Sequence, residues 1–106
     1  MYTAIRRYEG TDAGALREIT RRAEEEFVPL LKQIPGFMAY YIVDAGEGTI
    51  ASVSVFEDPA GVAESTRVAE RWVRDNIGAL APNPPQLTAG EVVVQAEREY
   101  PRRPRS

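Results

Sequence analysis

The order of its apolar segments constrains the fold of this chain most: strand, helix, strand, strand, helix, strand, with apolar side chains on both faces of the middle strands. The strands are predicted over residues 2–8, 37–43, 49–56 and 91–97, and the helices over residues 12–34 and 58–77. Right-handed crossovers place both helices on the same face of a four-stranded antiparallel sheet. The sequence therefore predicts an α+β fold of the ferredoxin-like βαββαβ type.

Two helices cover only one face of such a sheet, so the other face is left open. The side chains that this face would expose to water are apolar. They are either those at the alternating positions or the following set: Met38, Tyr40, Ile42, Val53 and Val55. Burying one large apolar side chain contributes about 1.5–3 kcal/mol, and soluble monomers rarely expose a patch of this kind. The sequence predicts a homodimer through the open face; the less favoured alternative is a monomer covered by its proline-rich loop and C-terminal tail.

Proline and glycine mark the breaks between the predicted elements. Pro29 lies inside the stripe of the first helix and predicts a kink or restart near residues 27–30. Asp58-Pro59 predicts the start of the second helix, with the carboxylate as N-cap. Residues 44–48 contain two glycines and predict the turn of a β-hairpin.

Length and composition set the outer limits of the molecule. A chain of 106 residues suits a single domain, assigned here to residues 1–97. Three prolines in residues 81–90 predict a loop, and the arginines and prolines of residues 98–106 predict a mobile tail. No apolar run reaches the roughly eighteen residues that cross a membrane, and no secretion signal is visible, so a cytoplasmic protein is expected.

The chain contains neither histidine nor cysteine, and its formal net charge is −3. Without these residues there is no Ser-His-Asp relay, no thiolate nucleophile, no disulfide and no histidine or thiolate metal ligand. No metal and no cofactor are therefore expected. The basic residues form no concentrated positive field, so neither a nucleic acid nor a membrane is expected as a partner.

Five side chains are candidates for a ligand site between the sheet and the helices: Arg6, Tyr41, Ser54, Trp72 and Asn76. An arginine on a central strand is paired, reaches the surface, or is free to bind an anion. For Arg6 the simpler interpretation is an ion pair with Glu57 or Glu91. Tyr40 and Tyr41 point to opposite faces, so one of them faces the helices and the other the open side.

The remaining candidates also have purely structural interpretations. The inner stripe of the second helix is predicted as Val62, Thr66, Ala69, Val73 and Ile77. Trp72 flanks this stripe, and a tryptophan is more often a packing anchor than a substrate platform. Asn76 suits a helix end, and Ser52 and Ser54 either line the cleft or make room for helix side chains. The residue types assign no catalytic residue.

Three segments carry a likeness to a known family: Phe27-Val28-Pro29-Leu30-Leu31, Pro35-Gly36-Phe37 leading into Tyr40-Tyr41, and Ser54-Val55-Phe56-Glu57-Asp58. From Tyr2 to about Ala96 the chain resembles the antibiotic-biosynthesis-monooxygenase-like family of dimeric α/β-barrel proteins. The resemblance implies that two ferredoxin-like sheets pair open face to open face into a barrel. It also implies a relation to cofactor-free oxygenases of aromatic polyketides and to a haem-degrading branch.

The residues agree unevenly with these two branches. The haem-degrading branch needs an asparagine on the first strand and a tryptophan and a histidine on the second helix, whereas this chain has arginines on that strand and no histidine. Haem degradation is therefore not expected. The quinone-forming oxygenases stabilise a substrate enolate with an asparagine, a tryptophan and a tyrosine. Trp72, Asn76, Tyr40 and Tyr41 are of these types, although their spacing matches no motif.

Two functions from different classes remain. The first is a monooxygenase-like enzyme, independent of cofactors, acting on a small aromatic or quinol-type substrate. The second is a non-enzymatic dimeric module that binds a small apolar or aromatic ligand or stabilises a partner, as the lack of histidine, cysteine and paired carboxylates favours. A defined closed pocket supports the first, and a cleft filled by its own side chains supports the second.

Overall fold

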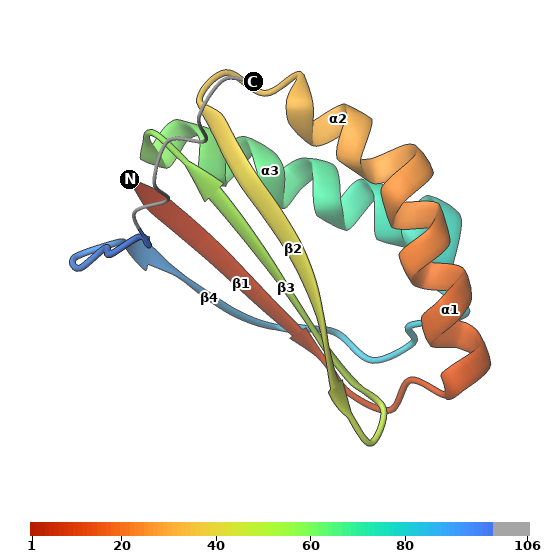
Figure 1. The fold of residues 1–106 in the computed structure, drawn as a ribbon. Helices are drawn as coiled ribbons and strands as arrows, with labels where there is room; N and C mark the ends of the chain where they lie inside the picture. Colours follow the sequence, from red (N-terminus) through yellow and green to blue (C-terminus); the bar gives the residue numbers. More distant parts are fainter. Residues whose placement is uncertain (99–106) are drawn as a thin grey trace, which may run out of the picture.

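A computed structural model describes residues 1–98, and within them the predicted ferredoxin-like fold is confirmed. Four strands form one antiparallel sheet in the order β2-β3-β1-β4 (Figure 1). The strands are β1 (Tyr2–Tyr8), β2 (Phe37–Gly46), β3 (Thr49–Phe56) and β4 (Gln86–Glu91). The first strand in the sequence therefore lies inside the sheet, between β3 and β4.

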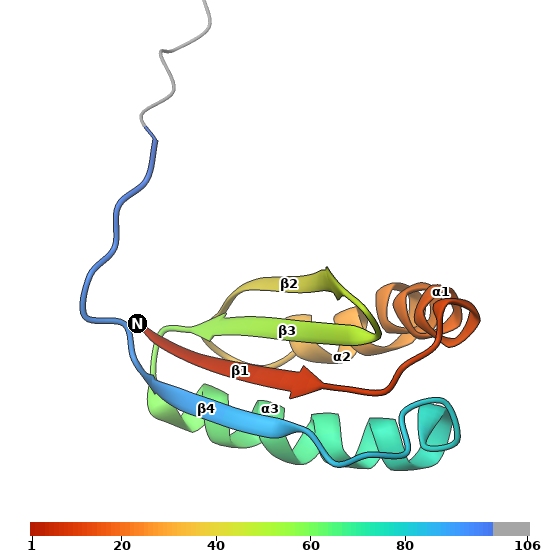
Figure 2. The same ribbon diagram turned by 90° about the horizontal axis from the view of Figure 1, so that it is seen from below.

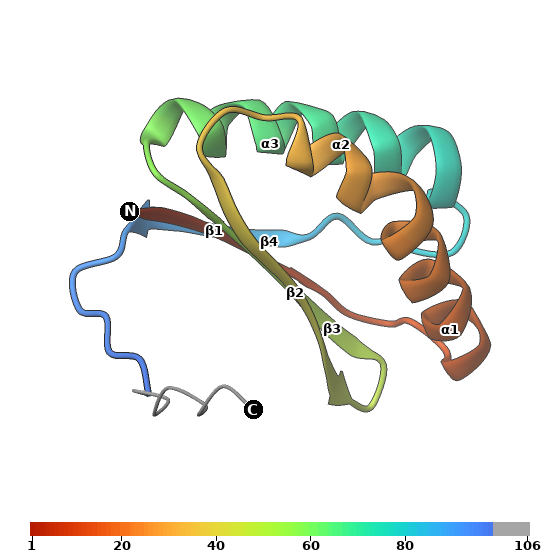
Figure 3. The ribbon, with the colours of Figure 1, turned by 45° about the horizontal axis from the view of Figure 1, so that its top comes forward.

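Two helical units lie on one face of this sheet. The first consists of α1 (Ala13–Arg22), η1 (Ala23–Phe27) and α2 (Val28–Lys32), and the second of α3 (Pro59–Trp72) and η2 (Val73–Ile77), where η denotes a π-helical turn. Figure 3 shows both units on the same side of the sheet. Within residues 1–98, no helix lies on the opposite side.

Both helical units begin at an aspartate. Asp12 Oδ1 accepts a hydrogen bond from the Ala15 N–H at 2.8 Å, and Asp58 Oδ1 accepts one from the Gly61 N–H at 2.9 Å. Each aspartate has the extended backbone of an N-cap and satisfies one of the unpaired amides of the first turn. The predicted start of the second helix at Asp58-Pro59 is therefore confirmed.

Pro29 accounts for the irregular turn in the first helical unit. Proline lacks the N–H of a regular helix, and its ring clashes with the preceding turn. The backbone widens just before it, so that the Val28 N–H bonds to the Ala23 carbonyl five residues earlier. The helix restarts as α2 at Val28, which confirms the restart predicted near residues 27–30.

The β2–β3 hairpin is longer than predicted and its turn is shorter. Asp44 still pairs with Ile50, so the turn consists of Glu47 and Gly48 instead of residues 44–48. Both residues have positive φ, 53° and 78°, as a two-residue type I′ turn requires. The predicted turn was too long, because the pairing of Asp44 with Ile50 keeps this polar residue in the strand.

The last strand was predicted at the wrong place. The sequence predicts residues 91–97, but β4 pairs residues 86–91 with β1. The Val92 N–H still bonds to the Met1 carbonyl at 2.9 Å, and β1 offers no partner beyond it. The strand propensity of Val93 and Val94 is therefore unused, and both side chains are exposed.

The core lies between the sheet and the helices, with Phe56 and Leu31 fully buried. The inner face of the second helical unit is rotated from the predicted stripe, because its buried residues are Gly61, Ser65, Ala69, Trp72 and Ile77. Gly61 explains the rotation: a Cβ at this position would lie 2.7 Å from Phe56 Cδ1. The small residues let α3 approach β3 closely, and this turns Trp72 into the core.

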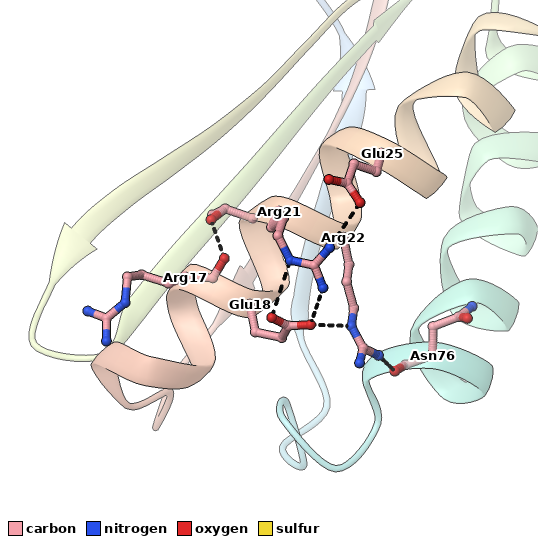
Figure 4. Close-up of polar contacts among 7 residues, drawn as sticks. Arg17, Glu18, Arg21, Arg22, Glu25 and Asn76 are labelled. Atoms are coloured by element: carbon pink, nitrogen blue, oxygen red, sulfur yellow. Dashed lines mark hydrogen bonds and ion pairs between the residues drawn. The ribbon is translucent and has the colours of Figure 1, made fainter.

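A polar network joins the two helical units at one end (Figure 4). Glu18 accepts hydrogen bonds at 2.6 Å from both Arg21 and Arg22. Arg22 Nη1 also donates to the backbone carbonyl of Asn76 at 2.7 Å, which links α1 to η2. Exposed ion pairs contribute only about 0–1 kcal/mol each, so this network mainly fixes the two units relative to each other.

The other sheet face carries apolar side chains. Tyr41 and Val43 lie on it with Val53 and Val55, while Tyr40 and Ile42 face the helices. This arrangement combines members of the two alternating sets considered from the sequence. Beyond β4 the chain leads away from the sheet (Figure 2). No helix within residues 1–98 is long and apolar enough to span a membrane, and the predicted tail, apart from Arg98, lies outside the described residues.

Candidate functional site

A small cavity of about 40 Å³ lies between the sheet and the two helical units. The strands contribute Arg6, Tyr8, Tyr40, Ile42, Ile50 and Ser52, and the helical layer contributes Ile19, Ala23, Phe27, Ala69, Trp72, Val73, Ile77 and Ala81. A buried water needs about 10–15 Å³, whereas benzene occupies an engineered cavity of about 150 Å³. The inner cavity therefore holds a few small atoms but no aromatic ring.

Three aromatic side chains pack against one another at this inner cavity. The ring of Phe27 lies 5.5 Å from that of Tyr40 in an edge-on arrangement, and 5.3 Å from that of Trp72 at a tilt of 30°. The indole Nε1 of Trp72 is buried and has no hydrogen-bond partner within residues 1–98. An unpaired buried donor is destabilising, so an acceptor that reached this N–H would stabilise the protein.

Both π-helical turns border the inner cavity. Ala23 and Phe27 come from η1, and Val73 and Ile77 come from η2. A π-helical turn rotates the following side chains relative to a regular α-helix, and such turns are frequent at functional sites. Here they shape the helical wall opposite Arg6 and Tyr40.

Arg6 is the most unusual side chain of the site. It is only 5% exposed, and its Nη2 donates to Thr66 Oγ1 at 2.8 Å. Within residues 1–98 it forms no ion pair, so the predicted partners Glu57 and Glu91 are wrong. Burial lowers the pKa of the guanidinium, against smaller Coulomb effects of Tyr8, Tyr40 and Glu70. A buried cation with one neutral hydrogen-bond partner is free to bind an anion.

Two tyrosine hydroxyls lie near this cation. Burial raises the pKa of Tyr40 to about 12, and a hydrogen bond with Ser52 partly offsets the effect. Burial also raises the pKa of Tyr8, which Arg6 opposes. Both phenols therefore remain protonated near neutral pH and can donate hydrogen bonds to a ligand.

An open cleft of about 530 Å³ adjoins the inner cavity. The two spaces share Arg6, Tyr8, Ala69, Val73 and Ala81, and the cleft adds Pro82, Pro84, Pro85 and Leu87 on one side and Thr66, Glu70, Arg74, Gly78 and Asn83 around it. Its volume falls within the range of small-molecule sites, about 300–1,000 Å³. Arg6 thus stands at the junction of a small aromatic cavity and a cleft of ligand size.

The structure brings together only part of the predicted site. Arg6 and Trp72 both line the inner cavity. Tyr41 is 59% exposed on the open sheet face, and Ser54 is fully buried and donates to the Ala4 carbonyl at 3.4 Å. The Asn76 side chain donates to the Trp72 carbonyl at 3.0 Å, so it caps the helix end. The ligand-binding role predicted for all five residues stays a prediction.

Three residues of the site were not among the five candidates, although Tyr40 and Ser52 were considered as alternatives to Tyr41 and Ser54. Tyr40 takes the place predicted for Tyr41, and Ser52 takes the place predicted for Ser54, because only these members of each pair reach the inner cavity. Tyr8 lines both spaces and lies on the same strand face as Arg6. The period-two alternation of β1 carries this signal, since residues two apart share a face.

The lining of the site favours one class of ligand. Among the described residues, those that line the inner cavity supply a cation, hydroxyls and apolar side chains, but no carboxylate. Within residues 1–98, no group of three or more acidic side chains is arranged to hold a metal ion. The arrangement can bind an anion and stabilise negative charge that develops on it.

Comparisons with known proteins identify structures with a similar fold. No protein-family model and no curated protein sequence matches the chain. Among solved structures, a monooxygenase from the gene ActVA-Orf6 of Streptomyces coelicolor, in complex with nanaomycin D, is 13% identical, with a TM-score of 0.73 and coverage of 92% of each chain. A protein of unknown function from Nitrosomonas europaea is 19% identical, with a TM-score of 0.73 and coverage of 92% of this chain and 94% of that one.

A third structure is described as a dimeric ferredoxin-like protein from an uncultured marine organism. It is 13% identical, covers 92% of each chain and has a TM-score of 0.71. Together these structures confirm the resemblance to the antibiotic-biosynthesis-monooxygenase proteins at the level of the fold. The chain has a monooxygenase-like fold.

Proposed function

We propose that this protein is a cofactor-independent oxygenase that binds a small phenolic or quinol-type aromatic molecule in the cleft beside Arg6. The observation that carries the proposal is the buried guanidinium of Arg6, which has no carboxylate partner within residues 1–98 and stands where the cleft meets the inner cavity. The Streptomyces monooxygenase of the same fold supports the reaction class.

The proposed reaction needs no metal because the substrate itself supplies the electrons. A phenolate is electron-rich, and a buried positive charge fixed beside its oxygen, such as that of Arg6, stabilises it. One phenol and one O₂ then give one quinone and one water. The ring C–H para to the hydroxyl is replaced by C=O, and both lost hydrogens leave with the second oxygen atom as water. Arg6 holds the negative charge, while Tyr8 and Tyr40 donate hydrogen bonds.

The reaction can be tested with 1-naphthol by following O₂ uptake and quinone absorbance. We expect one O₂ consumed per quinone formed, and a rate about 10²-fold lower in Arg6→Gln, since removing one charge-stabilising donor has effects of this size. Arg7→Gln is the matched control, because Arg7 is the next residue of β1 and its exposed side chain pairs with Glu9. Binding without O₂ uptake would exclude the oxygenase.

The second candidate is a non-enzymatic module that binds the same kind of ligand. The small volume of the inner cavity, about 40 Å³, favours it, because the side chains of the protein itself fill most of the space between sheet and helices. In that case calorimetry should show that 1-naphthol binds, and the compound should be recovered unchanged. The same experiment therefore separates the two candidates.

We further propose that the protein is a homodimer joined through the open sheet face. The exposed apolar side chains of this face, among them Tyr41 and Val43, support the proposal, as does the dimeric ferredoxin-like protein of the same fold. Pairing would remove these side chains from water, which stabilises by about 25 cal/mol per Å² of apolar surface buried. A cytoplasmic location, expected from the sequence, stays a prediction.

A further inference from the structure

We propose that the natural ligand is an aromatic carboxylic acid whose carboxylate binds Arg6 next to the reacting hydroxyl. The inference rests on the proposed function and specifies its substrate class: a hydroxyaryl acid, with its ring in the outer cleft and its two neighbouring oxygen groups at the junction with the inner cavity.

The first support is the hydrogen-bonding capacity of Arg6. A guanidinium has five N–H donors, and within residues 1–98 a single hydrogen bond of this group is formed, from Nη2 to Thr66 Oγ1. A buried charge is unfavourable unless it is paired. A carboxylate can accept two parallel hydrogen bonds from a guanidinium, which a neutral hydroxyl cannot do.

The second support is the sign of the surrounding groups. Around the inner cavity, Tyr8, Tyr40 and the unpaired indole N–H of Trp72 are hydrogen-bond donors, and no lining residue is acidic. Burial raises the pKa of both tyrosines, so they stay neutral and do not compete with an anion for Arg6. Glu70 borders the outer cleft, and its charge acts on Arg6 and Tyr8 from that side. Among the described residues that line the inner cavity Arg6 carries the only charge, so a small anionic group is favoured there.

The third support is the difference in size between the inner cavity and the outer cleft. The inner cavity, about 40 Å³, accommodates a group of a few atoms such as a carboxylate but no ring. The outer cleft, about 530 Å³, accommodates two fused rings, and Pro82, Pro84, Pro85 and Leu87 give it an apolar side. A ligand that satisfies both spaces has a small charged end and a flat apolar body.

Calorimetric titration of the purified chain with 1-hydroxy-2-naphthoate and with its neutral methyl ester tests this inference. The two probes share the ring and the hydroxyl and differ in the charge and in one methyl group. We expect the acid to bind at least about tenfold more tightly than the ester, because hydrogen bonds to charged groups contribute about 1.5–3 kcal/mol. In Arg6→Gln the two affinities should become equal, whereas Arg7→Gln should keep the preference.

Each outcome decides the inference. Equal binding of acid and ester by the wild-type protein overturns the carboxylate while leaving a phenol site in place. A preference for the acid that survives in a folded Arg6→Gln variant overturns the role of Arg6. No binding of the acid, the ester or 1-naphthol overturns the proposed function and the inference together. If Arg6→Gln does not fold, the wild-type ratio of the two affinities still decides the ligand class.

Discussion

Arg6 places a charge in the interior of the fold. A buried cation loses its hydration, and its single hydrogen bond to Thr66 offsets only part of that loss. Residues kept at such a disadvantage are typical of functional sites, where stability and activity are traded against each other. Measuring the stability of the protein without this charge therefore tests whether Arg6 has a structural role.

Replacing Arg6 by methionine should leave the free energy of unfolding unchanged or raise it by up to about 2 kcal/mol, because a long apolar side chain fills the site without a desolvated charge. Urea denaturation of the wild-type protein and the variant measures the difference. Arg67→Met is the control, since the exposed Arg67 of α3 pairs with Glu64 and a change within about 0.5 kcal/mol is expected. A loss of several kcal/mol in Arg6→Met would show that the charge is structural.

The buried phenol of Tyr40 makes the free energy of unfolding depend on pH in the alkaline range. Burial raises the pKa of its phenol to about 12, from the ordinary tyrosine value of about 10. Between these values the unfolded chain releases the phenolic proton while the folded chain retains it. The contribution to stability is thus fully present below the unfolded pKa and is lost as the pH rises through the folded pKa.

Between about pH 9 and about pH 11, the unfolding free energy should fall by about 1 kcal/mol more in the wild-type protein than in Tyr40→Phe. Denaturation at the two pH values measures this difference. An identical pH dependence in wild type and Tyr40→Phe would contradict the buried phenol.

At the scale of elements, the contact between α3 and β3 sets the geometry of the helical layer. Gly61 lies against the fully buried Phe56, whose ring packs edge-on against Phe37 at 5.7 Å. A methyl group at Gly61 would meet three atoms of Phe56 at 2.7–3.0 Å. The helix can then stay in place only if the Phe56 ring leaves its position.

Gly61→Ala should therefore lower the free energy of unfolding by about 1–3 kcal/mol, the usual effect of overpacking a core. Gly14→Ala is the matched control: it also places an alanine near the start of a helix, but its Cβ would meet only Asp12 Oδ1 at 3.4 Å. That variant should be unchanged or more stable by up to about 1 kcal/mol. Thermal denaturation of both variants measures the contrast, and equal effects would contradict the close helix approach.

The sequence predicted most elements because their signals are local. Asp58-Pro59 marks a helix start through its own capping chemistry, and Pro29 marks the irregular turn through its missing N–H. The last strand failed because its signal is not local. Gln86 to Glu91 form a strand only because β1 offers them partners, while Val93 and Val94, with higher strand propensity, lie past its end.

The site was predictable only in part for a similar reason. Alternation along β1 groups Arg6 with Tyr8, but choosing between Tyr40 and Tyr41 requires knowing which sheet face meets the helices. Trp72 was assigned to the edge of the helix stripe because Gly61 and Ser65 look like weak core residues in sequence. Their small size is what brings that side of the helix against the sheet.

At the scale of the whole molecule, the open sheet face predicts the state of assembly. A charge placed there should dissociate the proposed homodimer, because a buried and unpaired carboxylate opposes association. Tyr41→Glu should therefore sediment as a protomer at micromolar concentration, where the wild-type protein sediments as a dimer. Ala63→Glu is the control, since it adds the same charge at an exposed position of α3. Sedimentation of the wild-type protein as a protomer would contradict the proposed homodimer.

The position of Trp72 gives the molecule a built-in optical reporter. It is the single tryptophan of the chain, and its indole borders the inner cavity with its N–H unpaired within the described residues. Indole emission responds to local polarity and to hydrogen bonding, and in this protein all of it originates at one wall of the site. The arrival of any guest beside Arg6 can therefore be followed as a change in emission colour or intensity, in real time and without a label.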